Sequence, residues 1–105
     1  MIHSYFKENQ SDVLTIIQKL APEVGDLFDS HQFIGLFIKY QETTYIKFLN
    51  DKISKEADAV SNVNAEISNA LRVNADNLGI ENLGKVNSRN IYCLESPCAL
   101  WRRLR

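Results

Sequence analysis

Large apolar residues recur at helical spacing through residues 30–53, and this pattern constrains the fold more than any other part of the sequence. Two adjacent rows share one face, formed by Phe33, Phe37, Tyr40, Thr44 and Phe48 and by Ile34, Ile38, Tyr45, Leu49 and Ile53. Spacings of three and four residues place side chains on one side of an α-helix. A pair of strands around residues 41–44 is the rival interpretation, but that segment has no Gly, Asn or Asp to favour a tight hairpin. We therefore predict one long helix, with a kink or break near Thr43 and Thr44, because β-branched residues fit helices less well.

A first helix is predicted before this one, at residues 12–20. Ser11 is a favourable N-cap, and an apolar stripe of Val, Leu and Ile follows it. Pro22 disfavours helical geometry at the residue before it and marks the end. Residues 1–10 are expected to be a lead-in that docks its apolar side chains on the core.

A third helix is predicted at residues 62–78, with an inner face of Val, Ile, Ala and Leu. Gly79 follows where a left-handed C-terminal residue is favourable. Residues 51–60 are polar and are expected to connect this helix to the long one, which Asp29 or Ser30 would cap at its start.

The C-terminal segment has two interpretations. Residues 86–92 and 98–104 would pair as a hairpin around 94–97. Alternatively, Ser96 would be an N-cap with Pro97 at the first helical position, which is a recognised start of a helix. We prefer the hairpin, because an isolated strand over 86–92 would lack a partner.

Length and composition indicate one folded domain over residues 1–105. The apolar fraction of 45% and the charged fraction of 24% are typical of a globular protein. The longest apolar run, 33–38, is too short to span a membrane, and the first residues lack the pattern of a signal peptide. We expect a mainly α protein of the cytoplasm, with three principal helices and a small C-terminal β-hairpin or short helix.

No motif in the sequence points to catalysis. Phosphate-binding and dinucleotide-binding glycine patterns and the H-E-x-x-H zinc motif are all absent from the sequence. Cys93 and Cys98 have no second Cys or His pair, whereas structural zinc needs four ligands, so we interpret them as small apolar residues. His31 is expected to be a surface or capping residue. We expect a non-catalytic protein without cofactor or metal.

Basic residues gather toward the C-terminus, although the net charge is only −1. Residues 1–58 hold six lysines against nine acidic residues, and 59–105 hold six basic residues against four acidic ones. The basic residues of the second half are mostly arginine, whose planar fork suits phosphate. This half of the chain therefore suggests a surface for an anionic partner.

Nucleic acid is the partner that these residues suggest. Asn and Arg side chains can contact adenine and guanine edges, and Ser can contact bases or phosphates. Side chains of the predicted third helix and of the basic end are the candidates for nucleic-acid binding: Asn64, Ser68, Asn69, Arg72, Lys85, Arg89, Arg102, Arg103 and Arg105. Replacing the last three of these is expected to weaken binding with little effect on stability.

Three helices followed by a hairpin resemble the winged helix-turn-helix superfamily in the order of elements. The resemblance covers roughly residues 11–104. It implies that 62–78 is a recognition helix for DNA and that 86–104 is the wing, with Arg89, Arg102 and Arg103 facing phosphates.

A second hypothesis concerns protein interaction. The aromatic stripe of 30–53 is broad, and Tyr40, Tyr45 and Phe48 would cover a protein partner or a second copy of the chain. Trp101, the one tryptophan, is expected in the core.

Overall fold

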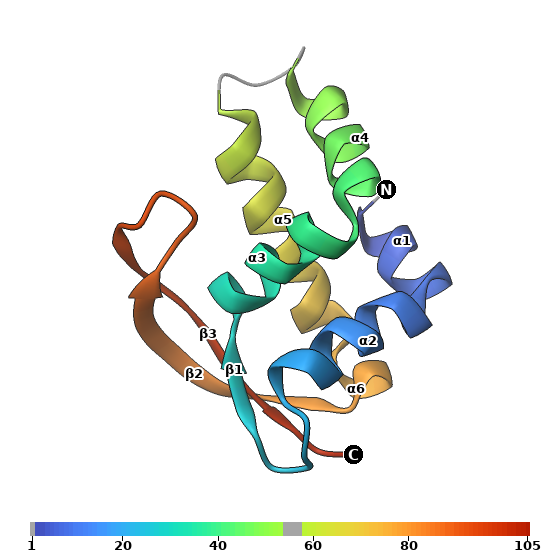
Figure 1. Cartoon of the computed structure of the whole chain (residues 1–105), viewed down its shortest axis with the longest axis vertical. Coiled ribbons are helices and arrows are strands. Elements are labelled where there is room, and N and C mark those ends of the chain that lie inside the picture. The colour runs from blue at the N-terminus through green and yellow to red at the C-terminus, as the bar shows by residue number, and fades with distance from the viewer. Residues whose placement is uncertain (1, 54–57) are drawn as a thin grey trace.

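Six helices and a three-stranded antiparallel sheet make up this protein, as a computed structural model that describes residues 2–53 and 58–105 shows. The helices lie on one side of the sheet (Figure 1). The expectation of a mainly α fold with three helices and a small hairpin is therefore wrong, and the fold is α+β. The helices predicted over 30–53 and 62–78 are each divided into two. The structure also has an N-terminal helix and a short strand that the sequence did not predict.

The N-terminal segment is helical rather than a lead-in. α1 spans Ile2–Glu8 and α2 spans Gln10–Leu20. Asn9 separates them, with φ −118° and ψ 42°. Ile2 and Phe6 lie one turn apart and are both buried, so α1 packs its apolar side on the core as a helix.

The long helix predicted over 30–53 is broken in two. α3 spans Ser30–Tyr40 and α4 spans Glu42–Ile53, with the break at Gln41, close to the predicted Thr43 and Thr44. The break lets the Phe48 ring return to that of Phe37, where the two stack with centroids 6.2 Å apart. A straight helix would carry these side chains away from each other, so packing decides the break.

Asp29 caps α3, which is one of the two alternatives predicted, Asp29 or Ser30. Its side chain accepts a hydrogen bond from the backbone N–H of Gln32, and the Gln32 side chain accepts one from the backbone N–H of Asp29. This reciprocal pair is a capping box, which satisfies two N–H groups that the helix itself leaves free. The start of α3 is thereby held against the strand before it.

The third predicted helix is also divided. α5 spans Ala59–Val73 and α6 spans Ala75–Leu78, with Asn74 between them. Gly79 follows in the left-handed conformation, with φ 68°, as predicted. The expected connector at 51–60 is shorter than predicted, because α4 and α5 extend into it, and its residues 54–57 lie outside the described part of the chain.

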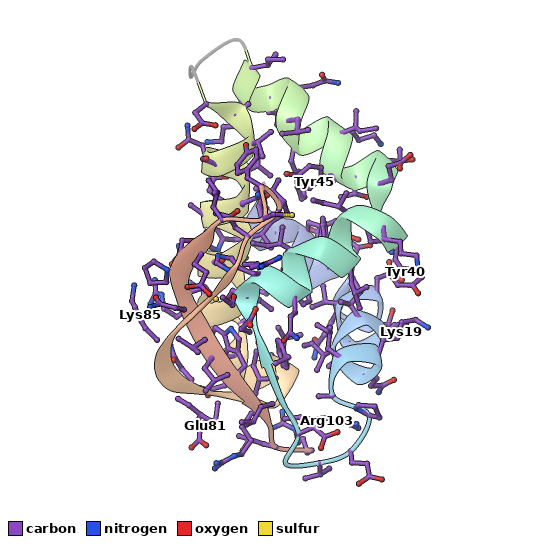
Figure 2. The ribbon with its side chains drawn as sticks, turned by 60° about the vertical axis from the view of Figure 1, so that its left-hand side comes forward. Lys19, Tyr40, Tyr45, Glu81, Lys85 and Arg103 are labelled. Carbon is purple, nitrogen blue, oxygen red and sulfur yellow. The ribbon has the colours of Figure 1, made fainter. Side chains whose placement is uncertain are left out.

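The sheet has the order β1–β3–β2, and both pairings are antiparallel. β1 spans Leu27–Asp29, β2 spans Ile80–Arg89 and β3 spans Glu95–Arg103. Lys85 and Glu81 mark the course of β2 in Figure 2. β1 has three residues, too few to show a strand pattern, and it exists because β3 offers it a partner.

The preferred C-terminal hairpin is present, but its turn was misplaced and the alternative helix is wrong. The turn lies at Asn90–Leu94 rather than 94–97, and the Asn90 side chain accepts hydrogen bonds from the N–H groups of Tyr92 and Leu94. Such local bonds from Asn stabilise turns. Pro97 instead lies inside β3, before Leu100, which is the first residue of β3 that pairs with β1. Its missing N–H therefore costs no bond to β1.

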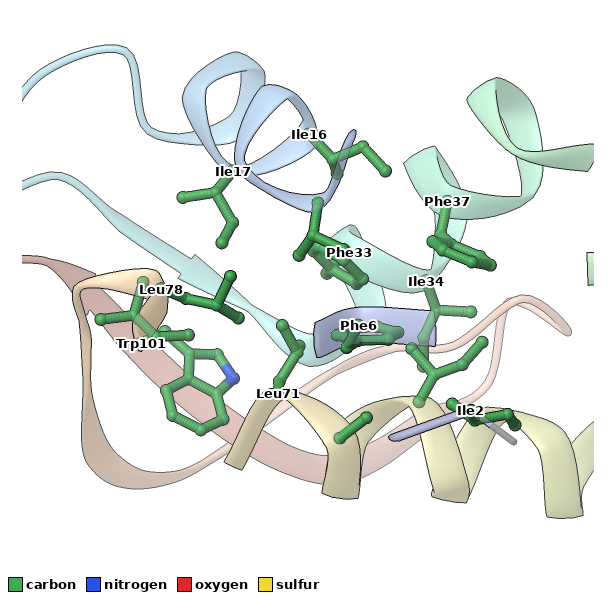
Figure 3. Close-up of a cluster of buried hydrophobic side chains, with 14 of the residues drawn as sticks. Ile2, Phe6, Ile16, Ile17, Phe33, Ile34, Phe37, Leu71, Leu78 and Trp101 are labelled. Atoms are coloured by element: carbon green, nitrogen blue, oxygen red, sulfur yellow. The ribbon is translucent and has the colours of Figure 1, made fainter. Parts of the chain in front are cut away.

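One hydrophobic cluster joins the helices to the sheet (Figure 3). Phe6, Phe33 and Phe37 form its aromatic centre, with Phe6 and Phe37 stacked at 6.0 Å. Trp101 of β3 is fully buried, as expected, and its Nε1 donates a hydrogen bond to the hydroxyl of Ser30. None of the helices in the described residues is long and apolar enough to cross a membrane.

Candidate binding groove between α5 and the hairpin

A groove of about 700 Å³ lies between α5 and the β2–β3 hairpin. One wall comes from the exposed side of α5 and the other from the hairpin and its turn. His31 and Ile34, near the start of α3, also line the groove. The groove therefore joins three segments that are far apart in the sequence.

The α5 wall follows from the helical period. Val63, Ile67, Ala70 and Leu71 are buried, which turns the opposite positions outward. Those positions carry four of the predicted binding residues, and all four line the groove: Asn64, Ser68, Asn69 and Arg72.

Hydrogen bonds fix part of this wall. The Asn64 side-chain oxygen accepts a hydrogen bond of 2.7 Å from the hydroxyl of Tyr45 on α4. The Arg72 Nε donates one of 3.0 Å to the Asn69 side-chain oxygen, one turn back along α5. Because its oxygen binds Tyr45, the side-chain NH₂ group of Asn64 lies on the side away from Tyr45. The bond to Asn69 holds the Arg72 guanidinium along the groove wall.

The hairpin wall is shaped by a bulge in β2. The register shifts between Asn82 and Lys85, so that two residues of β2 oppose one of β3. Gly84 within the bulge has φ 105°, which favours glycine, and its N–H donates a hydrogen bond to the Asn82 side chain. Asn82 and Lys85 both line the groove.

The lining of the groove carries positive charge and no carboxylate. Arg72 and Lys85 stand on opposite walls, and the described lining residues include three serines and four asparagines but neither Asp nor Glu. Within residues 2–53 and 58–105, no acidic group lies within ion-pair distance of Lys85. Glu66, the one acidic residue of α5, pairs instead with Lys52 of α4. An anionic ligand suits this lining best.

The remaining predicted site residues lie elsewhere. Arg89 is exposed on β2 but does not line the groove, and Arg102 forms a 3.4 Å ion pair with Glu81. Arg103, the last residue of β3, donates hydrogen bonds to the backbone carbonyls of Ala21 and Pro22, away from Lys85 in the middle of β2 (Figure 2).

Arg105 is also engaged, since its Nη2 donates a hydrogen bond of 2.8 Å to the carbonyl of Asp76. The basic end is therefore not one free cationic surface. Arg103 and Arg105 donate hydrogen bonds to backbone carbonyls of the fold, and their contact with nucleic acid and their small effect on stability stay predictions.

The groove also contains residues that the sequence did not single out. Asn90, Tyr92 and Ser96 come from the hairpin turn and its flanks, and His31 comes from α3. Their positions depend on the long-range packing of the hairpin against β1, α3 and α6. No local pattern in the sequence could have linked them to Asn64 or Arg72.

The aromatic stripe of 30–53 mostly belongs to the core. Phe33, Phe37, Tyr45 and Phe48 are buried, so they offer no surface to a protein partner. Tyr40 is exposed, with the ammonium group of Lys19 5.1 Å from its ring centre.

Known proteins provide no template for this fold or its groove. No family model, no curated protein and no solved structure matches the chain. The residues of the groove themselves therefore carry the functional inference.

Proposed function

We propose that this protein is a non-catalytic module that binds single-stranded nucleic acid in the groove between α5 and the hairpin. The observation that carries the proposal is the lining: Arg72 and Lys85 on facing walls, amide and hydroxyl groups between them, and no carboxylate among the described lining residues. Cations at two edges attract phosphates, and Asn and Ser side chains between them suit base edges.

A single strand fits the groove better than a duplex does. A helix that reads duplex DNA must enter the major groove with its polar face free. Here the hairpin lies across the groove from that face, and the groove volume of about 700 Å³ suits a ligand of a few rings. Tyr92 is 53% exposed at the rim, where its ring can stack on an unpaired base.

Two parts of the proposal rest on the sequence. Resemblance to winged helix-turn-helix domains, in which α5 would be the recognition helix, stays a prediction, because no solved structure matches the chain. Location in the cytoplasm also stays a prediction, and it is supported by the two free cysteines, of which Cys93 is exposed.

The test is fluorescence anisotropy with a labelled single strand and with its duplex, each over a salt series. Because two cations face the ligand, the slope of log affinity against log salt for the single strand should be about −1.4. Arg72→Gln and Lys85→Gln should each flatten that slope by about 0.7, and Tyr92→Ala should cost about 1–3 kcal/mol of affinity.

Arg102→Gln is the matched control, because Arg102 is exposed and pairs with Glu81 away from the groove. It should bind as the parent does. Equal weakening by Arg102→Gln, or no binding by the parent at low salt, would contradict the proposal. Tighter binding of the duplex would show that the groove is not the site.

The alternative is a protein-interaction or oligomerisation module. Tyr40 and Ile53 of the stripe over 30–53 are exposed, as is Ile46 of α4, which lies outside the stripe, and these three side chains would supply the surface. Light scattering over a concentration series tests self-association, and an increase in mass that Ile46→Lys abolishes would favour this alternative.

A further inference from the structure

Three side chains with different metal-binding atoms lie together beside the groove. The ligand atoms of Asp29, His31 and Cys98 are all within 4.8 Å of one another. Asp29 ends β1, His31 lies in the first turn of α3, and Cys98 lies in β3. The cluster thus forms where the capped start of α3 meets the sheet.

Strand pairing explains the proximity. Asp29 is opposite Leu100 in the β1–β3 register. Cys98 is two residues from Leu100 along β3, and alternate residues of a strand share a face. The capping box then fixes the turn of chain that carries Asp29 into α3 and brings His31 toward Cys98.

Hydroxyl groups hold the histidine ring from both sides. The Ser88 hydroxyl forms a hydrogen bond of 2.7 Å with Nδ1 of His31 and lies 3.5 Å from the Cys98 sulfur. The Ser96 hydroxyl lies 3.4 Å from Nε2. When a metal takes one ring nitrogen, the hydroxyl at the other remains to orient the ring, as outer hydrogen-bond partners do for metal-bound histidine.

We propose that Asp29, His31 and Cys98 bind a zinc ion at the wall of the groove. One oxygen, one nitrogen and one sulfur ligand suit Zn²⁺, whereas Mg²⁺ and Ca²⁺ prefer oxygen alone. His31 and Cys98 both line the groove, so the proposed site borders it. Three protein ligands with one open position are typical of zinc that binds a further ligand.

The site is independent of the nucleic-acid proposal. Its three ligands include neither Arg72 nor Lys85, and its test uses metal without nucleic acid. A failure of zinc binding would leave the anion-binding lining of the groove intact.

The experiment is a zinc titration of the full chain, reduced and metal-free, in competition with a chromogenic chelator. One zinc ion should bind per chain. Loss of a residue that only hydrogen-bonds to a metal ligand weakens metal binding about 10–100-fold. Cys98→Ser and His31→Gln remove ligands themselves, so each should weaken zinc binding by at least that factor. Cys93→Ser is the matched control, because Cys93 is an exposed cysteine of the same hairpin and lies outside the cluster.

Cobalt provides a second readout. Co²⁺ bound to the parent and to Cys93→Ser should show a thiolate charge-transfer absorption that Cys98→Ser lacks, and circular dichroism checks that each variant is folded. His31 is half-buried, so His31→Gln keeps the test decisive if Cys98→Ser does not fold. The proposal is overturned if the parent binds no zinc, if His31→Gln binds as tightly as the parent, or if Cys93→Ser weakens binding as strongly as Cys98→Ser.

Discussion

At the scale of the residue, Tyr45 connects the core to the groove. Its ring is buried in the cluster, and its hydroxyl reaches Asn64 on the groove wall. Burial raises the pKa of Tyr45 above the ordinary value of 10.0, the neighbouring Tyr92 raises it further, and the hydrogen bond with Asn64 opposes both effects. The folded protein therefore resists ionisation of this phenol.

Tyr45→Phe should destabilise the protein at neutral pH and matter less in alkali. Loss of the hydrogen bond should cost about 1 kcal/mol of unfolding free energy at pH 7. The protonated phenol contributes fully to the unfolding free energy below about pH 10, the ordinary pKa of tyrosine. This contribution is lost as pH rises through the pKa of Tyr45 in the folded protein, because the unfolded chain releases the proton at lower pH. Urea unfolding at pH 7 and above pH 10 should show the difference between parent and variant shrinking. A constant difference would contradict this.

At the scale of the element, Gly79 is the single residue between the end of α6 and the start of β2. Its N–H donates a hydrogen bond to the carbonyl of Asp76, and its own carbonyl accepts one from the N–H of Leu104. Its φ of 68° is unfavourable for residues with a Cβ. A Cβ at this position would also lie 2.8 Å from Cγ of Arg105.

Gly79→Ala should therefore destabilise the protein by about 1–2 kcal/mol, the cost of a left-handed conformation for a residue with a side chain. Gly35→Ala is the matched control. Gly35 lies inside α3, where an added Cβ meets nothing within 4 Å, so alanine should stabilise the protein by about 0.5–1 kcal/mol. Thermal unfolding monitored by circular dichroism measures both, and a shift of the same sign in the two variants would refute the explanation.

At the scale of the whole molecule, the end of β3 ties the sheet to the helices. The backbone of Arg103 pairs with Gly25 and with Asp26 in the loop before β1. Its guanidinium binds the carbonyls of Ala21 and Pro22, at the end of α2. The two guanidinium bonds span some 80 residues of sequence and hold the end of β3 to the segment between α2 and β1.

Arg103→Gln should lower the unfolding free energy by about 1–3 kcal/mol, because it removes hydrogen bonds from a charged donor. Arg89→Gln, on the exposed side of β2, should change it by less than about 0.5 kcal/mol. Urea unfolding of the two variants beside the parent is the measurement. Equal stability of Arg103→Gln and Arg89→Gln would show that the bonds to Ala21 and Pro22 contribute nothing.

Local pattern was enough to predict most of the helical regions after α1 and several of their ends. The 3.6-residue period identified the cores of α2, α3, α4 and α5, and four of the predicted site residues do share one wall of the groove. Asp29 and Gly79 cap helices as expected, and Trp101 is buried. Each of these features depends on side chains within a few turns of one another, or on one large apolar ring, and both are visible in a single sequence.

By itself, then, the sequence determined the helical stretches of α2 to α5, where several helices end and which of their faces are apolar, but it did not determine α1. The tertiary structure alone decided the rest: strand β1, the break at Gln41, the turn at Asn90–Leu94, the groove, and the meeting of His31 with Cys98. The physical reason is the distance along the sequence between the residues that interact. A helix satisfies its backbone within itself, whereas a strand, a groove wall or a ligand cluster exists only once distant segments pack together.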